Sequence, residues 1–346
     1  MRPAVEGGYV KDILDQPAAL ERSVAGFTED PALTVLGEAL RGGRYRLVVL
    51  TGMGSSYHAF QPLLIELTEL GVPAMLLETS ELVYYHSGLL TPDTVTVMLS
   101  QSGRSAETVR LLELNAGRST VVAVTNTPDS PLAAAANASV MTQAGAEFSV
   151  SCKTYLTSLA ALAWLGDHLA GRDLGRSRDQ LRQLAPAVNS YLEHWREYVA
   201  AAQGELGGIE RLYYVGRGAS LATAGTAGLT TKESARFPAE GMSAAAFRHG
   251  PLELVDGRTF LLAFEGDPRT AELNRRLASD VKMAGGRAVV VREAGRPGLF
   301  HTPSVPARLR PVAEMLPVQM MTLALAAMAG HEAGAFALAS KVTETE

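Results

Sequence analysis

Residues 46–56 read RLVVLTGMGSS, which is a short apolar run rich in β-branched residues, then a glycine, then small polar residues that lead into a helical pattern. Such a pattern predicts a buried strand, a tight turn and a helix. Similar apolar runs at 72–78, 94–100 and 119–126 alternate with helical or small-residue segments. Apolar strands that alternate with helices indicate an α/β fold with a doubly wound parallel sheet.

The same pattern begins again in the second half of the chain. A shift of 164 residues lays two glycines and a serine on identical residues: Gly52, Gly54 and Ser56 fall on Gly216, Gly218 and Ser220. Chance can produce glycine turns after strands, because the loops there often need glycine. Three matches within five residues, each between an apolar strand and a small-residue helix, favour an internal duplication instead.

The duplication predicts five segments along the chain. They are an N-terminal leader helix (1–30), a first α/β domain (31–171), a connector helix (172–205), a second α/β domain (206–330) and a C-terminal tail (331–346). In the second domain we expect further strands at 259–265 and 287–293 and a closing helix at about 312–330.

Composition excludes several classes of protein. With 47% hydrophobic and 19% charged residues, the chain is not disordered. The net charge of −5 includes no long run of one sign, so we expect no nucleic-acid partner. Cys152 is the only cysteine, which excludes an intramolecular disulfide and a cysteine zinc cluster and fits a reducing, cytoplasmic compartment.

No motif predicts a metal, a cofactor or a membrane anchor. The seven histidines show neither HxH nor HExxH spacing. GMGSSY lacks the third glycine of a dinucleotide fingerprint, and no GxxxxGK[ST] loop is present. The N-terminus lacks the apolar core of a secretory signal. The apolar stretch 315–330 is interrupted by Pro317 and Gln319 and is shorter than a bilayer span.

Two loops of the first domain have the chemistry of an anion site. Residues 52–56 and 100–105 (SQSGRS) both lie between a predicted strand and a predicted helix, and offer hydroxyls, backbone N–H groups and helix dipoles to a phosphate. Serines there are most often simple helix caps, but two such loops together favour a binding site. The counterpart loop in the second domain, FEGD at 264–267, has carboxylates instead of hydroxyls. We therefore expect the anion site only in the first domain.

Several motifs together resemble a known family. They are TGMGSSY, SQSGRSAET and VTNTPDSPLA in the first half, and GRGAS, TTKES, FRHGPLELVD and SKVTETE in the second. This set resembles proteins with a double sugar-isomerase (SIS) domain, and is similar to the isomerase half of glucosamine-6-phosphate synthase and to stand-alone phosphosugar deaminases and deglycases. The resemblance implies two flavodoxin-like αβα subdomains and a sugar phosphate as ligand.

The resemblance also implies the residues of the site. The phosphate would be held by Ser56, Ser100, Gln101, Ser102 and Ser105, with Ser55 beside them. Glu233 would take the carbon-bound proton and His249 would open the sugar ring, because moving a proton between C1 and C2 needs a carboxylate base and a second proton shuttle. Without the resemblance, Glu233 would be an ordinary solvated helix residue and His249 a helix-capping or core histidine.

Lys341 resembles a lysine that forms a Schiff base with an open-chain keto sugar, although an exposed tail lysine would look the same. The family's histidine comes from the neighbouring subunit, so a homodimer with composite sites is implied.

Some positions depart from the family pattern. Thr226 and Thr230 stand where the family usually has a glutamate and a lysine, which affects the proton relay. Lys341 is displaced by one position, and the segment 147–154 is one residue shorter than usual. Gly54, Val150 and Cys152 would line the substrate, so the altered segment predicts a different sugar preference.

The chain starts Met1-Arg2, without the nucleophilic cysteine of an amidotransferase, so we expect no glutaminase activity. The sequence predicts an enzyme that acts on an amino- or amine-linked hexose 6-phosphate, as an isomerising deaminase or a deglycase. Two alternatives stay open, a non-catalytic phosphosugar sensor and a simple aldose–ketose isomerase. A sensor commonly carries a helix-turn-helix domain, for which the sequence gives no sign.

Overall fold

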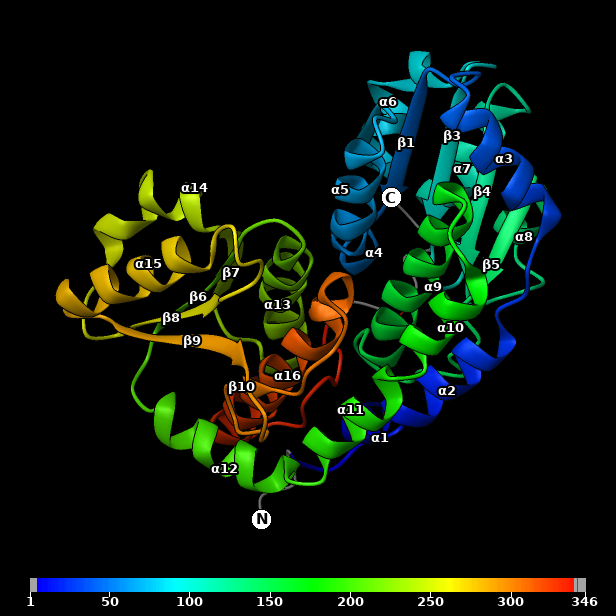
Figure 1. The fold of residues 1–346 in the computed structure, drawn as a ribbon. Coiled ribbons are helices and arrows are strands. Elements are labelled where there is room, and N and C mark those ends of the chain that lie inside the picture. Colours follow the sequence, from blue (N-terminus) through cyan, green and yellow to red (C-terminus); the bar gives the residue numbers. More distant parts are fainter. Residues whose placement is uncertain (1–4, 339–340, 342–346) are drawn as a thin grey trace. The chain divides into compact units, whose positions relative to one another are not determined.

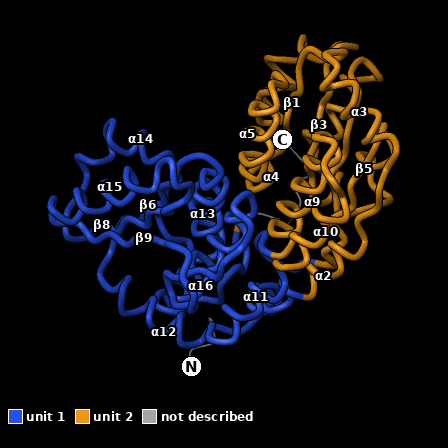
Figure 2. Tube along the Cα trace, viewed as in Figure 1, with its two compact units in different colours: residues 1–17, 147–152, 184–337 blue, residues 18–146, 153–183, 338–346 orange. Residues whose placement is uncertain are grey.

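The computed structural model describes residues 5–338 and 341, which fold as two compact units (Figures 1 and 2). Unit 1 comprises residues 1–17, 147–152 and 184–337. Unit 2 comprises residues 18–146, 153–183 and 338–346. The chain therefore passes between the units several times, although each unit has a sheet of its own.

Unit 2 contains the first predicted sheet. Its elements are α2 (Gln16–Gly26, which begins in unit 1), α3 (Pro31–Arg41), β1 (Leu47–Gly52), α4 (Ser55–Ala59), α5 (Gln61–Glu69), β2 (Ala74–Glu78), α6 (Thr79–Tyr84), η2 (Ser87–Leu89), β3 (Thr94–Leu99), α7 (Ala106–Asn115), β4 (Thr120–Thr125), α8 (Pro131–Ala135), β5 (Ala138–Met141), α9 (Lys153–Ala170) and α10 (Leu174–Leu181). The five strands are parallel and follow the order β2-β1-β3-β4-β5.

Unit 1 contains the second sheet. Its elements are α1 (Gly8–Leu14), α11 (Leu184–Leu192), α12 (Trp195–Glu205), β6 (Arg211–Gly216), α13 (Ser220–Ala235), β7 (Ala239–Ser243), α14 (Ala244–Arg248), η3 (Pro251–Leu254), β8 (Thr259–Phe264), α15 (Ala271–Met283), β9 (Arg287–Glu293), β10 (His301–Thr302), η4 (Ala307–Leu309) and α16 (Arg310–Ala329). Its parallel strands follow the order β10-β9-β8-β6-β7.

The two sheets have the same topology. When the strands of each sheet are numbered along the chain, both follow the flavodoxin-like order 2-1-3-4-5. The registers agree as well, since Thr51 pairs with Met98 at the end of β1 and Val215 pairs with Ala263 at the end of β6. This confirms the predicted fold class of two doubly wound subdomains related by duplication.

Three strands lack the apolar signal that predicted the others. β5, β7 and β10 all lie at the edge of a sheet, and β7 (AEGMS) and β10 (HT) show no apolar run. An edge strand has a neighbour on one side only, so fewer of its side chains need to be apolar.

The residues predicted as one connector helix form three helices, α10, α11 and α12. Pro186 lies in the first turn of α11, where a proline costs no helical hydrogen bond.

Helix α16 forms the core of unit 1. Together with the preceding turn it spans Ala307–Ala329, and among the described helices it alone is long and apolar enough to cross a membrane. However, 89% of its most apolar 18-residue stretch is buried inside the protein. It packs against α12 and α13. Its buried Gln319 exchanges two hydrogen bonds of 2.9 Å with the amide of Gln16. The helix is therefore a core helix whose one buried amide is satisfied internally.

Candidate functional site

The first candidate loop follows β1 and turns tightly. Gly54 has a φ of +54°, a left-handed conformation that favours glycine, and α4 begins immediately after it. A Cβ on Gly52 would lie 3.0 Å from the carbonyl oxygen of Leu99 and from the backbone of Ser56. The loop is therefore packed directly against the end of β3. Ser55 and Ser56 are half-buried, and their hydroxyls have no hydrogen-bond partner among the described residues.

The second candidate loop follows β3 and is held by its own serines. The hydroxyl oxygen of Ser100 accepts a hydrogen bond from Gly103 N (3.1 Å), and that of Ser102 accepts one from Arg104 N (3.2 Å). Gly103 has a φ of +60°, and a Cβ there would lie 2.3 Å from Ser130 Oγ. Glycine is therefore the residue that allows this loop to lie against the start of α8.

The rest of this loop joins β4 and α7. The carbonyl oxygen of Gln101 accepts a hydrogen bond from Asn126 N (3.1 Å), and Ser105 Oγ lies 2.8 Å from Thr108 Oγ1. Ser105 immediately precedes α7 but makes no side-chain cap, so the amides of the first turn of α7 keep their capacity to bind an anion.

The structure brings the six predicted phosphate residues to one edge of the first sheet. β1 and β3 are adjacent, and in this strand order the topological switch point lies between them. The residues are Ser55, Ser56, Ser100, Gln101, Ser102 and Ser105, with Gly54 beside them. The hydroxyls and helix N-termini gathered there suit a phosphate.

Sequence reasoning missed one carboxylate at this edge. Glu107, in the first turn of α7, is 9% exposed, and one of its carboxylate oxygens has no hydrogen-bond partner among the described residues. An acidic residue near a helix N-terminus is favoured by the helix dipole. The sequence signal that could have identified Glu107 is its position two residues after Ser105.

In unit 1, Glu233 lies near the end of α13. This helix approaches β7 through glycines, because a Cβ on Gly228 would lie 2.6 Å from Gly241 N and a Cβ on Gly241 would clash with Ala224 O. Glu233 itself is half-buried. The small residues of α13, which the sequence showed as a helical signal, therefore serve to hold the helix close to the sheet.

Tyr9 is a buried phenol whose pKa responds both to Glu233 and to Cys152 of the predicted substrate wall. Its phenol is fully buried, and burial raises its pKa well above the ordinary value, with additional increases from the charges of Cys152, Glu233 and Glu147. Cys152 N donates a hydrogen bond to Glu147 Oε1 (2.9 Å). Cys152 and Glu233 are thus within electrostatic reach of the same phenol, a relationship that the sequence did not reveal.

The other wall residue, Val150, is 1% exposed, as is Cys152. Both side chains are packed in the protein interior of the described structure. A change at either position would therefore act by displacing neighbouring groups as well as by changing the wall itself.

His249 ends α14 and is exposed. Its backbone N donates to Ala246 O (2.9 Å), and its ring makes no hydrogen bond or ion pair with the described residues. Helix α13 ends at the amino edge of the second sheet, whereas α14 begins at the carboxyl edge, after β7. Within one chain, His249 and Glu233 therefore lie at opposite edges of the second sheet.

The remaining predicted residues lie apart from these. Lys341 is half-buried, and its neighbours Ser340 and Val342 are outside the described residues. Thr226 and Thr230 are buried on α13, and the hydroxyl of each lacks a hydrogen-bond partner in the described part of the chain. Within residues 5–338 and 341, no group of three or more His, Cys, Asp or Glu could hold a metal ion.

Two flavodoxin-like sheets, with hydroxyl loops at the switch point of the first, define a double-domain α/β protein with one candidate anion site. The SIS domain model matches residues 45–166 and 205–296, and the chain belongs to the SIS domain family. It is similar to the isomerizing glutamine–fructose-6-phosphate aminotransferase of Pyrococcus horikoshii, with 29% identity over 346 residues, 95% of this chain and 56% of that protein. The chain thus spans about half the length of the curated relatives it matches.

Solved structures agree on the fold. The C-terminal domain of glucosamine-fructose-6-phosphate aminotransferase from Francisella tularensis superposes with a TM-score of 0.84 and 22% identity, over 95% of this chain and 98% of that one. Tagatose-6-phosphate ketose/aldose isomerase from Escherichia coli gives a TM-score of 0.83 and 18% identity, over 98% of each chain. Their names state different reactions, so the fold alone does not decide the reaction.

Proposed function

We propose that this chain converts an amino- or amine-linked hexose 6-phosphate, as an isomerising deaminase or a deglycase that uses no glutamine. The observation that carries the proposal is the pair of hydroxyl loops at the switch point of the first sheet, together with the half-buried Glu233 on α13. We expect it to work in the cytoplasm, without a cofactor or a metal ion, as a homodimer.

The phosphate is bound by hydroxyls and amides rather than by a basic surface. Ser102 and Ser105 offer hydroxyls beside the first turn of α7, and Ser55 and Ser56 offer hydroxyls that have no described protein partner. Hydrogen bonds to a charged group are stronger than those between neutral groups. This explains how a chain of net charge −5 can bind an anion.

The chemistry needs a proton moved between neighbouring carbons. For an amino sugar, His249 protonates the ring oxygen as the ring opens, and Glu233 takes the C2 proton and returns it to C1. In an amino sugar the nitrogen at C2 becomes an imine, water adds to that carbon, and ammonia leaves. In a fructosamine the nitrogen is on C1, so the proton moves from C1 to C2, the imine forms at C1, and its hydrolysis releases the linked amine. Lys341 would act only where a Schiff base with the keto sugar forms.

The wall residues set the choice of sugar in this proposal. Gly54 lies in the phosphate loop, and Cys152 shares with Glu233 an electrostatic influence on Tyr9. The shortened segment that contains Val150 and Cys152 would therefore change the space near the reacting carbons.

The test is nuclear magnetic resonance of glucosamine 6-phosphate, galactosamine 6-phosphate and a fructosamine 6-phosphate incubated with the protein. We expect turnover of at least one of them and its loss in Glu233→Gln. The matched control is Glu240→Gln, because Glu240 is an exposed glutamate on β7 and should not affect turnover. Turnover that survives Glu233→Gln would overturn the role of this residue.

A non-catalytic sensor is the second candidate. The buried hydroxyls of Thr226 and Thr230, which have no described partner, favour it because they do not provide a charged proton relay on α13. Binding of all three sugar phosphates without conversion of any would support this candidate and exclude the enzyme. Fructose 6-phosphate is incubated in the same way, and its conversion without conversion of the other three would instead indicate a simple aldose–ketose isomerase.

A further inference from the structure

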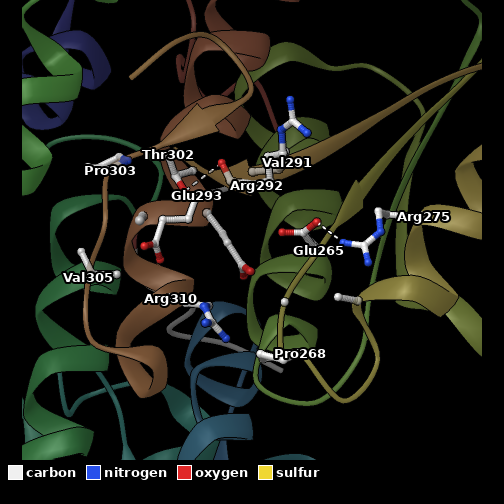
Figure 3. A pocket seen from close by; sticks show the side chains of 14 residues that line it. Glu265, Pro268, Arg275, Val291, Arg292, Glu293, Thr302, Pro303, Val305 and Arg310 are labelled. Carbon is white, nitrogen blue, oxygen red and sulfur yellow. Dashed lines mark hydrogen bonds and ion pairs between the residues drawn. The ribbon is translucent and has the colours of Figure 1, made fainter. Parts of the chain in front are cut away.

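Unit 1 contains a cavity of about 290 Å³ at the carboxyl edge of the second sheet (Figure 3). Its walls come from the ends of β8 and β9, the start of α15, the segment around β10 and the start of α16. Neither the serine loops nor Glu233 belongs to it. The proposed reaction therefore leaves this cavity unused.

The cavity lies beside the counterpart of the phosphate loop. In the second sheet β8 is the neighbour of β6, as β3 is the neighbour of β1 in the first. Glu265, Gly266 and Pro268, which follow β8, thus correspond to the serine loop that follows β3. The second domain therefore has a cavity at the corresponding edge, but the groups that line it differ from those of the serine loop.

Most of the charges that line the cavity are already balanced. Glu265 and Arg275 form an ion pair of 2.6 Å. Glu314 is 5% exposed, and its two carboxylate oxygens accept hydrogen bonds from Ser220 (2.7 Å) and Thr223 (2.9 Å). These groups satisfy one another and leave little for a ligand.

Two lining residues of opposite charge, Arg310 and Glu293, form no ion pair with the described residues. The guanidinium of Arg310, at the start of α16, makes no ion pair or hydrogen bond with the described residues, although its charge acts at longer range on Asp267 and Glu314. Glu293 accepts one hydrogen bond, from Ser304 Oγ (2.5 Å), and keeps further acceptor capacity. In Figure 3 the head groups of Glu265, Glu293 and Arg310 surround one space, whereas Arg292 points away from it.

We propose that this cavity binds a small zwitterion, with its anionic group at Arg310 and its ammonium group at Glu293. The start of α16 adds the positive end of a helix dipole on the side of the anion. The volume lies near the lower end of the range for ligand pockets, roughly 300–1,000 Å³, which suits one small metabolite better than a nucleotide. Amino sugar phosphates and α-amino acids both have this chemistry.

The experiment measures binding by calorimetry to the full chain carrying Ser102→Ala, which weakens the serine-loop site. The probes are glucosamine 6-phosphate and alanine as zwitterions, and glucosamine and inorganic phosphate as single-charge controls. We expect one zwitterion to bind more tightly than either control. Binding of glucosamine 6-phosphate alone identifies an amino sugar phosphate, and binding of alanine alone identifies an amino acid.

Variants then locate the site. Arg310→Gln and Glu293→Gln should each weaken zwitterion binding by about tenfold, the effect of losing a hydrogen bond between charged groups. Arg296→Gln and Glu205→Gln, which change exposed residues outside the cavity, should leave it unchanged. Unchanged melting temperatures show that the variants are folded.

The proposal is overturned if neither zwitterion binds, if phosphate alone binds equally well, or if both cavity variants bind like the controls. Failure of this proposal is distinct from failure of the proposed function, because turnover is measured separately in the protein with Ser102 unchanged. Glu233→Gln should abolish turnover and retain zwitterion binding at the cavity.

Discussion

Mixing of two inactive variants tests whether Glu233 and His249 of different chains act in one site. The variants are Glu233→Gln and His249→Ala, each made with its own affinity tag and co-expressed in equal amounts. Both changes are on unit 1, but at different ends of β7. His249 is exposed, and Glu233→Gln keeps the size of the half-buried side chain, so we expect both variants to fold.

The expected recovery follows from the proposed homodimer. In that proposal each site takes Glu233 from one chain and His249 from the other, which agrees with the positions of α13 and α14 at opposite edges of the second sheet. Random pairing makes about half of the dimers mixed, and a mixed dimer has one intact site of two. Turnover should therefore return to about a quarter of that of the unmutated protein.

Product formation is followed by nuclear magnetic resonance on dimers purified through both tags and on the unselected mixture. The control mixes His249→Ala with a chain carrying both changes, a combination in which no pairing restores a site. The reasoning is refuted if doubly tagged dimers are inactive, or if His249→Ala alone keeps its turnover.

Three further predictions concern the loops and the buried phenols. Ser102→Ala should weaken sugar-phosphate binding about tenfold in calorimetry, through the lost hydrogen bond to a charged group, and leave the melting temperature nearly unchanged. Gly103→Ala should lower the free energy of unfolding in urea by about 1–3 kcal/mol, because it combines a left-handed φ with a Cβ 2.3 Å from Ser130 Oγ. The control is Gly117→Ala, because Gly117 has a φ of +79° and a Cβ there would meet no atom within 4 Å. An equal loss of unfolding free energy in this control would refute the contact with Ser130 as the cause. Burial raises the pKa of Tyr9 and Tyr191 above the ordinary value of 10, so the unfolded chain loses these protons first, and the free energy of unfolding should fall as the pH rises above about 10. Tyr9→Phe should flatten that decline in urea titrations between pH 8 and 11, and an unchanged slope would contradict it.

The strands could be predicted where burial on both faces requires a continuous apolar run. β1, β3, β4, β6 and β8 are of this kind. The edge strands β5, β7 and β10 could not, because they are short or partly polar and have a neighbour on one side only. The internal repeat was visible because the glycine turns after β1 and β6 need the same residues at the same spacing.

Within the site, the serine loops could be predicted because each is a short continuous stretch between a strand and a helix. The burial of Glu107 beside them could not, since a glutamate in a first helical turn is usually solvated. Neither could the common influence of Cys152 and Glu233 on Tyr9, because the three residues are far apart in the chain.

The sequence by itself determined the α/β class, the duplication and the two hydroxyl loops, since strand burial, turn chemistry and loop composition are local properties. Only the tertiary structure decided that Glu233 and His249 lie at different edges of one sheet, and that the second copy retains a cavity lined by Arg310 and Glu293. Arg310 comes from a helix 45 residues after the loop at Glu265. Its place beside that loop depends on how α16 packs in the core of unit 1, which no local pattern encodes.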